Sequence, residues 1–214
     1  MKTSKLLETN GYQGFVYYSG DDVTADMRKQ CFELDKRFFK EKYLYNQTKV
    51  DNWLKNYNEM CSVLYNPQDK KVIAYCFYLF ISDTALQEMK ENKLSYFTLG
   101  EKNLVKTKEN EKVNLFCLSD ACMPGWDFVE MHRIMNEYNV YVLNKLAKNK
   151  KVKVENVCID VVCEYDEILI KQFHIDNFVE TNHESKFYWG KFNPEKTWKY
   201  CKYSSALIEE YKKL

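Results

Sequence analysis

Proline and glycine are scarce in this sequence of 214 residues, which contains three of the former and six of the latter. These two residues are the strongest local breaks in regular structure. Their rarity, together with the lack of any internal repeat or low-complexity linker, favours one domain over residues 1–214 rather than two. A chain of this length can bury a sizeable core.

The sequence also lacks an excess of charge of one sign and a long apolar run. Its 32 basic and 31 acidic residues give a formal net charge of +1, whereas nucleic-acid binders normally show a basic excess. The apolar stretch Val72–Ile81 is about half as long as a membrane span. Residues 1–14 lack the apolar core of a signal peptide. We therefore expect a cytoplasmic protein with no nucleic-acid and no membrane partner.

Histidine occurs only three times, whereas cysteine occurs eight times. A chain with this many ordinary core residues does not need disulfides, so we predict reduced, buried thiols. Cys117 and Cys122, like Cys158 and Cys163, are five positions apart, and such positions face opposite sides of a strand. Neither pair can bind one metal ion without a turn between them. We predict no metal site.

What the sequence does contain is an orderly series of strand and helix patterns. Helices are expected at residues 24–39, 50–57, 84–92, 127–149 and 167–177, and strands at 15–18, 61–65, 72–81, 114–121 and 157–162, followed by a hairpin at 178–192. Residues 93–111 form a long polar connection with room for one short strand, Leu94–Thr98. The tail, residues 193–214, is expected to end in a helix that packs Trp198, Leu207 and Tyr211.

The most informative segment runs from the strand at 114–121 into the helix at 127–149. Cys122–Trp126, which contains a Pro-Gly pair, separates the two elements. The first backbone N–H groups of a helix lack helical partners and attract anions. This segment is therefore a candidate site for a phosphorylated cofactor.

The order of elements over residues 12–192 resembles the GNAT acyl-CoA N-acyltransferase superfamily. Residues 66–75 resemble its hairpin into the third strand, where Ala74-Tyr75 stands for a common Gly-Tyr or Ala-Tyr pair. Asn177-Phe178 stands where the family usually has Gly-Phe. The resemblance implies an α/β (α+β) fold: a single GNAT-like domain with a mixed central sheet flanked by helices, and residues 193–214 as a C-terminal helical extension.

The resemblance further implies an acyl-CoA co-substrate, such as acetyl-CoA. The acyl group would pass directly to a primary amine of a small molecule or peptide, through a tetrahedral intermediate. In the family, the backbone of the strand end binds the pantetheine arm and polarises the thioester carbonyl. The cofactor-binding residues implied are Leu118, Ala121, Cys122, Gly125, Trp126, Asp127 and Phe128. A homodimer is left open.

The phosphate-binding turn departs from the family pattern. Aligning Pro124 with the family's usual proline places Asp127 at an arginine position, and Glu130 and His132 at glycine positions. Acidic groups beside a pyrophosphate would oppose its binding. Either the turn has another register, in which Gly125 allows close approach, or cofactor binding is lost. Asp127 also has the character of a helix N-cap.

The catalytic residues depart as well, because the family's usual tyrosine falls on Phe173, which carries no proton. We predict Tyr165 as the acid, with His174 as a substitute. The attacking amine needs a base, and we predict Asp120, with Asp160 as the other candidate because a carboxylate in an apolar strand must be paired or protonated.

Two other functions stay open. One is a catalytically inactive GNAT-fold module that binds a ligand or protein partner in the same cleft. The other is an enzyme with Cys122 as nucleophile, since a helix N-terminus can lower the pKa of a thiol.

Overall fold

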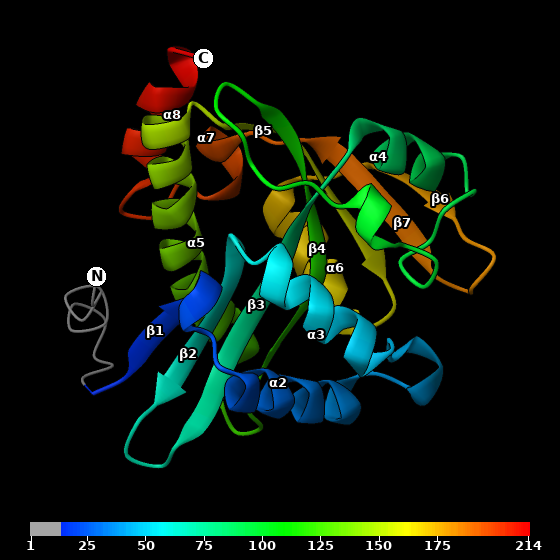
Figure 1. Ribbon diagram of the computed structural model, residues 1–214, viewed down its shortest axis with the longest axis vertical. Helices are drawn as coiled ribbons and strands as arrows, with labels where there is room; N and C mark the ends of the chain where they lie inside the picture. The colour runs from blue at the N-terminus through cyan, green and yellow to red at the C-terminus, as the bar shows by residue number, and fades with distance from the viewer. Residues whose placement is uncertain (1–13) are drawn as a thin grey trace. The chain divides into compact units, whose positions relative to one another are not determined.

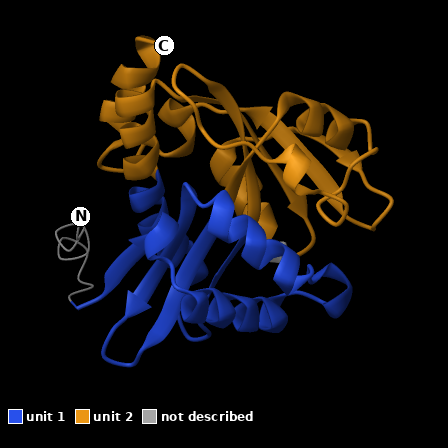
Figure 2. Ribbon diagram, in the orientation of Figure 1, with its two compact units in different colours: residues 1–77, 119–139 blue, residues 78–118, 140–214 orange. Residues whose placement is uncertain are grey.

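The computed structural model describes residues 14–214, apart from the side chains of Glu164 and Tyr165. It divides into two compact units (Figure 2). Unit 1 comprises the chain up to residue 77 and residues 119–139, and unit 2 comprises residues 78–118 and 140–214. The chain passes between the units inside β3 (Lys71–Ile81), β4 (Lys112–Cys122) and α5 (Phe128–Lys150). One domain over residues 1–214 stays a prediction.

The strands form a seven-stranded sheet in the order β1-β2-β3-β4-β5-β7-β6. β4 and β5 are parallel, whereas β1 pairs antiparallel with β2, and β7 pairs antiparallel with both β5 and β6. The bounds are Val16–Ser19 for β1, Met60–Asn66 for β2, Lys153–Val161 for β5, Asn177–Glu180 for β6 and Lys186–Lys191 for β7. The predicted fold class, a mixed sheet flanked by helices, is confirmed.

Unit 1 contains α2 (Ala25–Phe38) and α3 (Gln47–Asn56) besides the first part of α5 (Figure 1). Thr24 caps α2, because its side chain accepts a hydrogen bond from the backbone N–H of Met27. Successive residues of a strand point to opposite faces. In β3, Tyr75 accordingly contacts α2, whereas Cys76 lies against α5.

Unit 2 contains α4 (Asp83–Lys90), α6 (Glu164–Phe173), α7 (Pro194–Thr197) and α8 (Ser204–Lys212). The strand predicted at Leu94–Thr98 is wrong. These residues form turns instead, because the Thr98 hydroxyl accepts from the Ser95 N–H at 3.0 Å and the Ser95 carbonyl accepts from the Thr98 N–H at 3.1 Å. Such local bonds compete with a sheet ladder. Across the described residues, no helix has both the length and the apolar character that crossing a bilayer requires.

The C-terminal tail packs as predicted. Trp198, Leu207 and Tyr211 are all buried. Tyr211, on α8, also accepts a hydrogen bond at its hydroxyl oxygen from the backbone N–H of Val154 in β5, at 3.0 Å. The helix is thereby tied to the strand by a polar contact as well as by apolar packing.

Tyr211→Phe is expected to lower the free energy of unfolding by about 1–3 kcal/mol, because it leaves the buried N–H of Val154 without its acceptor. Urea unfolding followed by fluorescence measures the change. The matched control is Tyr200→Phe, since Tyr200 is 79% exposed and its change should stay within about 0.5 kcal/mol. Equal effects of the two substitutions would contradict a structural role for the Tyr211 hydroxyl.

Candidate active site

A buried carboxylate with three hydroxyl donors lies in unit 1. Asp35 Oδ2 accepts from the Tyr45 hydroxyl at 2.6 Å, and Asp35 Oδ1 accepts from the hydroxyls of Tyr75 and, at 2.9 Å, Ser119. The Tyr75 and Ser119 hydroxyl oxygens are 2.8 Å apart. Asp35, Tyr75 and Ser119 are buried, whereas Tyr45 is partly exposed. We call these four residues the Asp35 network.

The Asp35 network holds a carboxyl group of unusual basicity. Burial raises the pKa of Asp35 from 3.8 to about 6, and the hydrogen bonds from Tyr45, Tyr75 and Ser119 oppose this rise only in part. The pKa values of Tyr45 and Tyr75 are raised well above 10, chiefly by burial and next by the charge of Asp35. At neutral pH the network therefore contains one carboxylate and neutral tyrosines, which is the protonation state of a general base with its donors.

Ser119 lies in the part of β4 that extends beyond its pairing with β5. The parallel register ends at Cys117↔Ile159, whereas β4 continues to Cys122. Leu118, Ala121 and Cys122, three of the predicted cofactor-binding residues, lie in this extension. Side chains alternate along it, so that Ser119 joins the Asp35 network while Asp120 faces α5.

The turn after β4 differs from the phosphate-binding turn expected at the N-terminus of a helix. Asp127 is the N-cap of α5, because its Oδ1 accepts from the Glu130 N–H at 2.7 Å. A carboxylate of the chain thus already occupies the place where an anion would bind. Gly125 has a φ of +92°, and a Cβ added there would meet no atom within 4 Å. A glycine is therefore needed at position 125 for the positive φ of the turn, and not to let another group approach the backbone closely. The predicted roles of Trp126 and Phe128 stay predictions.

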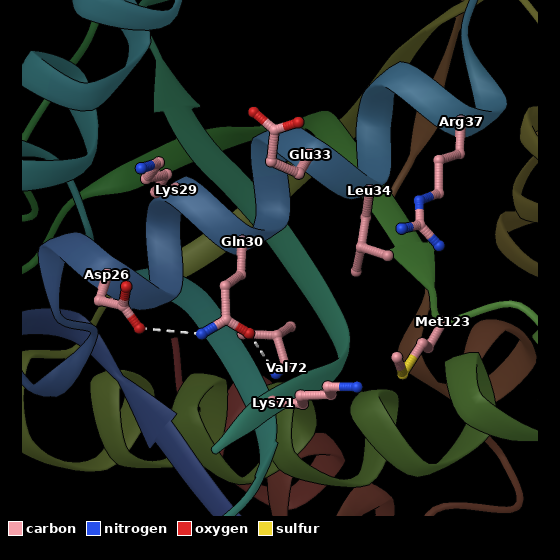
Figure 3. A pocket seen from close by; sticks show the side chains of 9 residues that line it. All are labelled: Asp26, Lys29, Gln30, Glu33, Leu34, Arg37, Lys71, Val72 and Met123. Atoms are coloured by element: carbon pink, nitrogen blue, oxygen red, sulfur yellow. Dashed lines mark hydrogen bonds between the residues drawn. The ribbon is translucent and has the colours of Figure 1, made fainter. Parts of the chain in front are cut away.

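A groove of about 300 Å³ opens beside this turn (Figure 3). It lies between α2 and the start of β3, and Met123, the residue before the Pro-Gly pair, forms one end. Arg37 and Lys71 direct their charged groups toward the Met123 end, whereas Asp26 lies at the other end and accepts from Gln30 at 2.9 Å. The Met123 end is therefore a positively charged surface next to the turn.

Asp120, the predicted base, is buried on the α5 side of unit 1. Its Oδ2 lies 3.2 Å from His132 Nε2, and both side chains are almost fully buried. Cys76 completes the group on the neighbouring strand. The role of Asp120 as a base stays a prediction, and the structure adds that a buried histidine lies within ion-pair distance of its carboxyl group.

The thiol of Cys122 is not activated. Burial, together with the carboxylates of Asp120 and Asp127, raises its pKa to about 11. A reactive cysteine requires a lowered pKa, so the structure argues against the cysteine-nucleophile alternative. All eight cysteines lie in the described part of the chain, where they are free thiols and seven of them are buried, as predicted.

The other predicted residues lie in unit 2. Tyr165 belongs to α6, but its side chain lies outside the described residues. His174 is the left-handed C-cap that ends α6, with a φ of 52°, and Phe173 is buried against Trp198. Burial raises the pKa of Asp160, while a hydrogen bond with Ser185 opposes the rise.

Comparisons with known proteins identify the fold. No family model matches the sequence, and no curated protein matches it. Among solved structures, the loading GNATL domain of CurA from Lyngbya majuscula has a TM-score of 0.52 at 10% identity, over 84% of this chain and 97% of that one. A mosquito arylalkylamine N-acetyltransferase-like 5b has a TM-score of 0.50 at 10% identity, over 83% of this chain and 100% of that one. Naa20 from Chaetomium thermophilum, in complex with a bisubstrate analogue, has a TM-score of 0.50 at 10% identity, over 86% of this chain and 88% of that one. The GNAT fold expected from the sequence is confirmed.

Proposed function

We propose that this chain, a divergent member of the GNAT fold, transfers an acyl group from acyl-CoA to an amine. The observation that carries the proposal is the Asp35 network, a basic carboxylate held at the segment of β4 that extends beyond its pairing with β5. The fold alone does not fix a function. A buried carboxylate costs stability, and a carboxylate beside β4 is what a proton acceptor for an amine would require.

In the proposed reaction, the neutral amine nitrogen attacks the thioester carbonyl carbon and forms a C–N bond. The tetrahedral intermediate then expels the CoA thiolate as the C–S bond breaks. The proton lost by the nitrogen passes to the Tyr45 hydroxyl oxygen as the Tyr45 proton moves to Asp35 Oδ2, 2.6 Å away. Because the pKa of Tyr45 is raised, the two transfers are concerted and no tyrosinate accumulates. Backbone N–H groups near the end of β4 would stabilise the oxyanion.

The groove at Met123 supplies the positive charge that the turn lacks. Asp127 and Glu130 make the α5 N-terminus acidic, and Glu130 is paired with Arg133 at 2.9 Å. We therefore place the phosphate groups of acyl-CoA at Arg37 and Lys71 rather than at the helix N-terminus. Arginine and lysine are the usual phosphate-binding side chains.

Incubation with acetyl-CoA and a panel of primary amines tests the function directly. Release of the CoA thiol, together with a mass increase of the amine by one acetyl group, is the expected result. The panel includes aromatic amines, polyamines and peptides with a free N-terminus, because the acceptor class is part of the question. If acetyl-CoA and longer acyl-CoAs at millimolar concentration neither raise the melting temperature nor release thiol, the acyltransferase proposal is wrong and the inactive module is favoured.

Arg37→Ala and Lys71→Ala are each expected to raise the Kd for CoA about 10- to 100-fold, because a hydrogen bond to a charged group contributes about 1.5–3 kcal/mol. Calorimetric titration with CoA measures the effect, and titration with dephospho-CoA, which lacks the 3′-phosphate, shows whether that phosphate is the one concerned. Lys40→Ala is the matched control, since Lys40 is an exposed lysine just after α2 that does not line the groove. A Kd that changes equally in all three variants would refute this placement.

A further inference from the structure

Three side chains of metal-ligand type converge in the interior of unit 1. Cys76 from β3, Asp120 from β4 and His132 from α5 place a sulfur, a carboxylate oxygen and a ring nitrogen within 4.8 Å of one another. Cys76, Asp120 and His132 are 0%, 6% and 3% exposed to solvent, respectively. The 3.2 Å between Asp120 Oδ2 and His132 Nε2 is about the spacing of two ligand atoms that each lie about 2.0 Å from one tetrahedral ion.

The His132 ring is held in one orientation. It stacks on Phe128 with ring centroids 5.7 Å apart and an interplanar angle of 15°. On the side away from Asp120, its Nδ1 is 3.1 Å from the Asn136 side-chain nitrogen. The two ends of an asparagine amide are interchangeable by a flip, and the flipped amide would accept the Nδ1 proton. Nε2 would then present its lone pair to an ion, which is the usual arrangement of a metal-bound histidine.

We propose that Cys76, Asp120 and His132 bind a divalent transition-metal ion, with Zn²⁺ as the best match. The donor set of sulfur, nitrogen and oxygen excludes Mg²⁺ and Ca²⁺, which prefer oxygen alone. A thiolate, a carboxylate and a neutral imidazole carry two negative charges, so a divalent cation makes the site neutral. Neutrality matters because an uncompensated charge in this interior would be costly.

The site is structural rather than catalytic. The cavity that the three residues line with Ala74 and Met131 has no room for a water molecule. Asp120 would therefore supply both carboxylate oxygens, which completes four ligands without solvent. The ion would tie β3, β4 and α5 together on the face of the sheet opposite to the Asp35 network. This inference is independent of the proposed acyl transfer.

Metal analysis and cobalt substitution test the site without any activity assay. Full-length protein purified without chelator or a histidine tag is expected to contain about one zinc per chain. After removal of the metal, Co²⁺ should produce a near-ultraviolet thiolate-to-cobalt band and intense visible bands of a four-coordinate ion. Zn²⁺ should restore several degrees of melting temperature.

Cys76→Ser is expected to lose the thiolate band, and His132→Gln to lose at least tenfold in zinc affinity. Cys61→Ser is the matched control, because Cys61 is an equally buried thiol of unit 1 outside the cluster. Wild-type protein without zinc, without a cobalt band and without a zinc-dependent melting temperature would overturn the proposal. A cobalt band that persists in Cys76→Ser would overturn it equally. The wild-type measurements decide the matter even where a variant fails to fold.

Discussion

Asp35→Asn is expected to lower kcat for acyl transfer about 10²- to 10⁴-fold, the usual contribution of a general base, with little change in the Kd for acyl-CoA. The amide keeps the shape of the carboxylate but cannot take a proton. Tyr45→Phe should reproduce most of this loss if the proton travels through the Tyr45 hydroxyl. Steady-state kinetics at several amine concentrations, together with calorimetric titration of acyl-CoA, separate the two parameters.

The pH profile distinguishes a base from a merely structural carboxylate. In the wild type, kcat/KM should rise with pH through about 6 as Asp35 loses its proton, and the ionisation of the amine itself adds a second rise at higher pH. Asp35→Asn should lose the first rise and keep the second. Glu41→Gln, which changes an exposed carboxyl four residues before Tyr45, should behave as the wild type. A full rate in Asp35→Asn would show that Asp35 is not the base.

The free energy of unfolding should depend on the same carboxyl group in the opposite direction: it should fall, not rise, as Asp35 loses its proton. The pKa of Asp35 is raised from 3.8 to about 6, so between these values the folded state binds more protons than the unfolded state. The free energy of unfolding contributed by Asp35 is therefore complete only well below pH 3.8, and it is lost as the pH rises through about 6. At about 1.36 kcal/mol per pKa unit, the loss is about 3 kcal/mol.

Comparison with Asp35→Asn isolates this contribution. Burial also raises the pKa of Asp166 to about 6, but that residue is common to both proteins and cancels in the difference. The thiol of Cys31 and the phenols of Tyr45 and Tyr75, which face Asp35, titrate far above this range because their pKa values are raised. Urea unfolding of both proteins at pH 4 and pH 7 should show the variant gaining about 2 kcal/mol on the wild type, because part of the contribution of Asp35 is already lost at pH 4. A pH-independent difference would mean that Asp35 titrates at its ordinary value.

The sequence alone predicts the elements well because each has a local signal. The helices expected at residues 127–149 and 24–39 depend on neighbours a few positions away, and both predictions agree with α5 and α2. The Leu94–Thr98 strand failed for a local reason also. The Ser95 and Thr98 side chains offer the backbone turn partners that an apolar pattern does not reveal.

The two buried clusters could not be predicted in the same way, because their members are far apart in the chain. Asp35 and Ser119 are separated by 84 positions, and Cys76 is 44 positions from Asp120. One signal did exist for Asp35. It lies four residues after Cys31, on the apolar side of its helix, where an acidic residue must have a buried partner. Cys76, Asp120 and His132 come from two strands and a helix, so local spacing in the sequence does not reveal them as a group.

The three passages of the chain between the units have a consequence for how the protein is made. Unit 1 needs residues 119–139, which follow 41 residues of unit 2, so neither unit is a continuous segment. A ribosome that has synthesised the first hundred residues has produced Asp35, Tyr45, Tyr75 and Cys76 but none of their partners on β4 and α5. These polar side chains, most of which become buried in the folded protein, stay solvated until residues 119–139 have been synthesised. We therefore expect co-translational folding to begin late, with units 1 and 2 folding at about the same stage of synthesis.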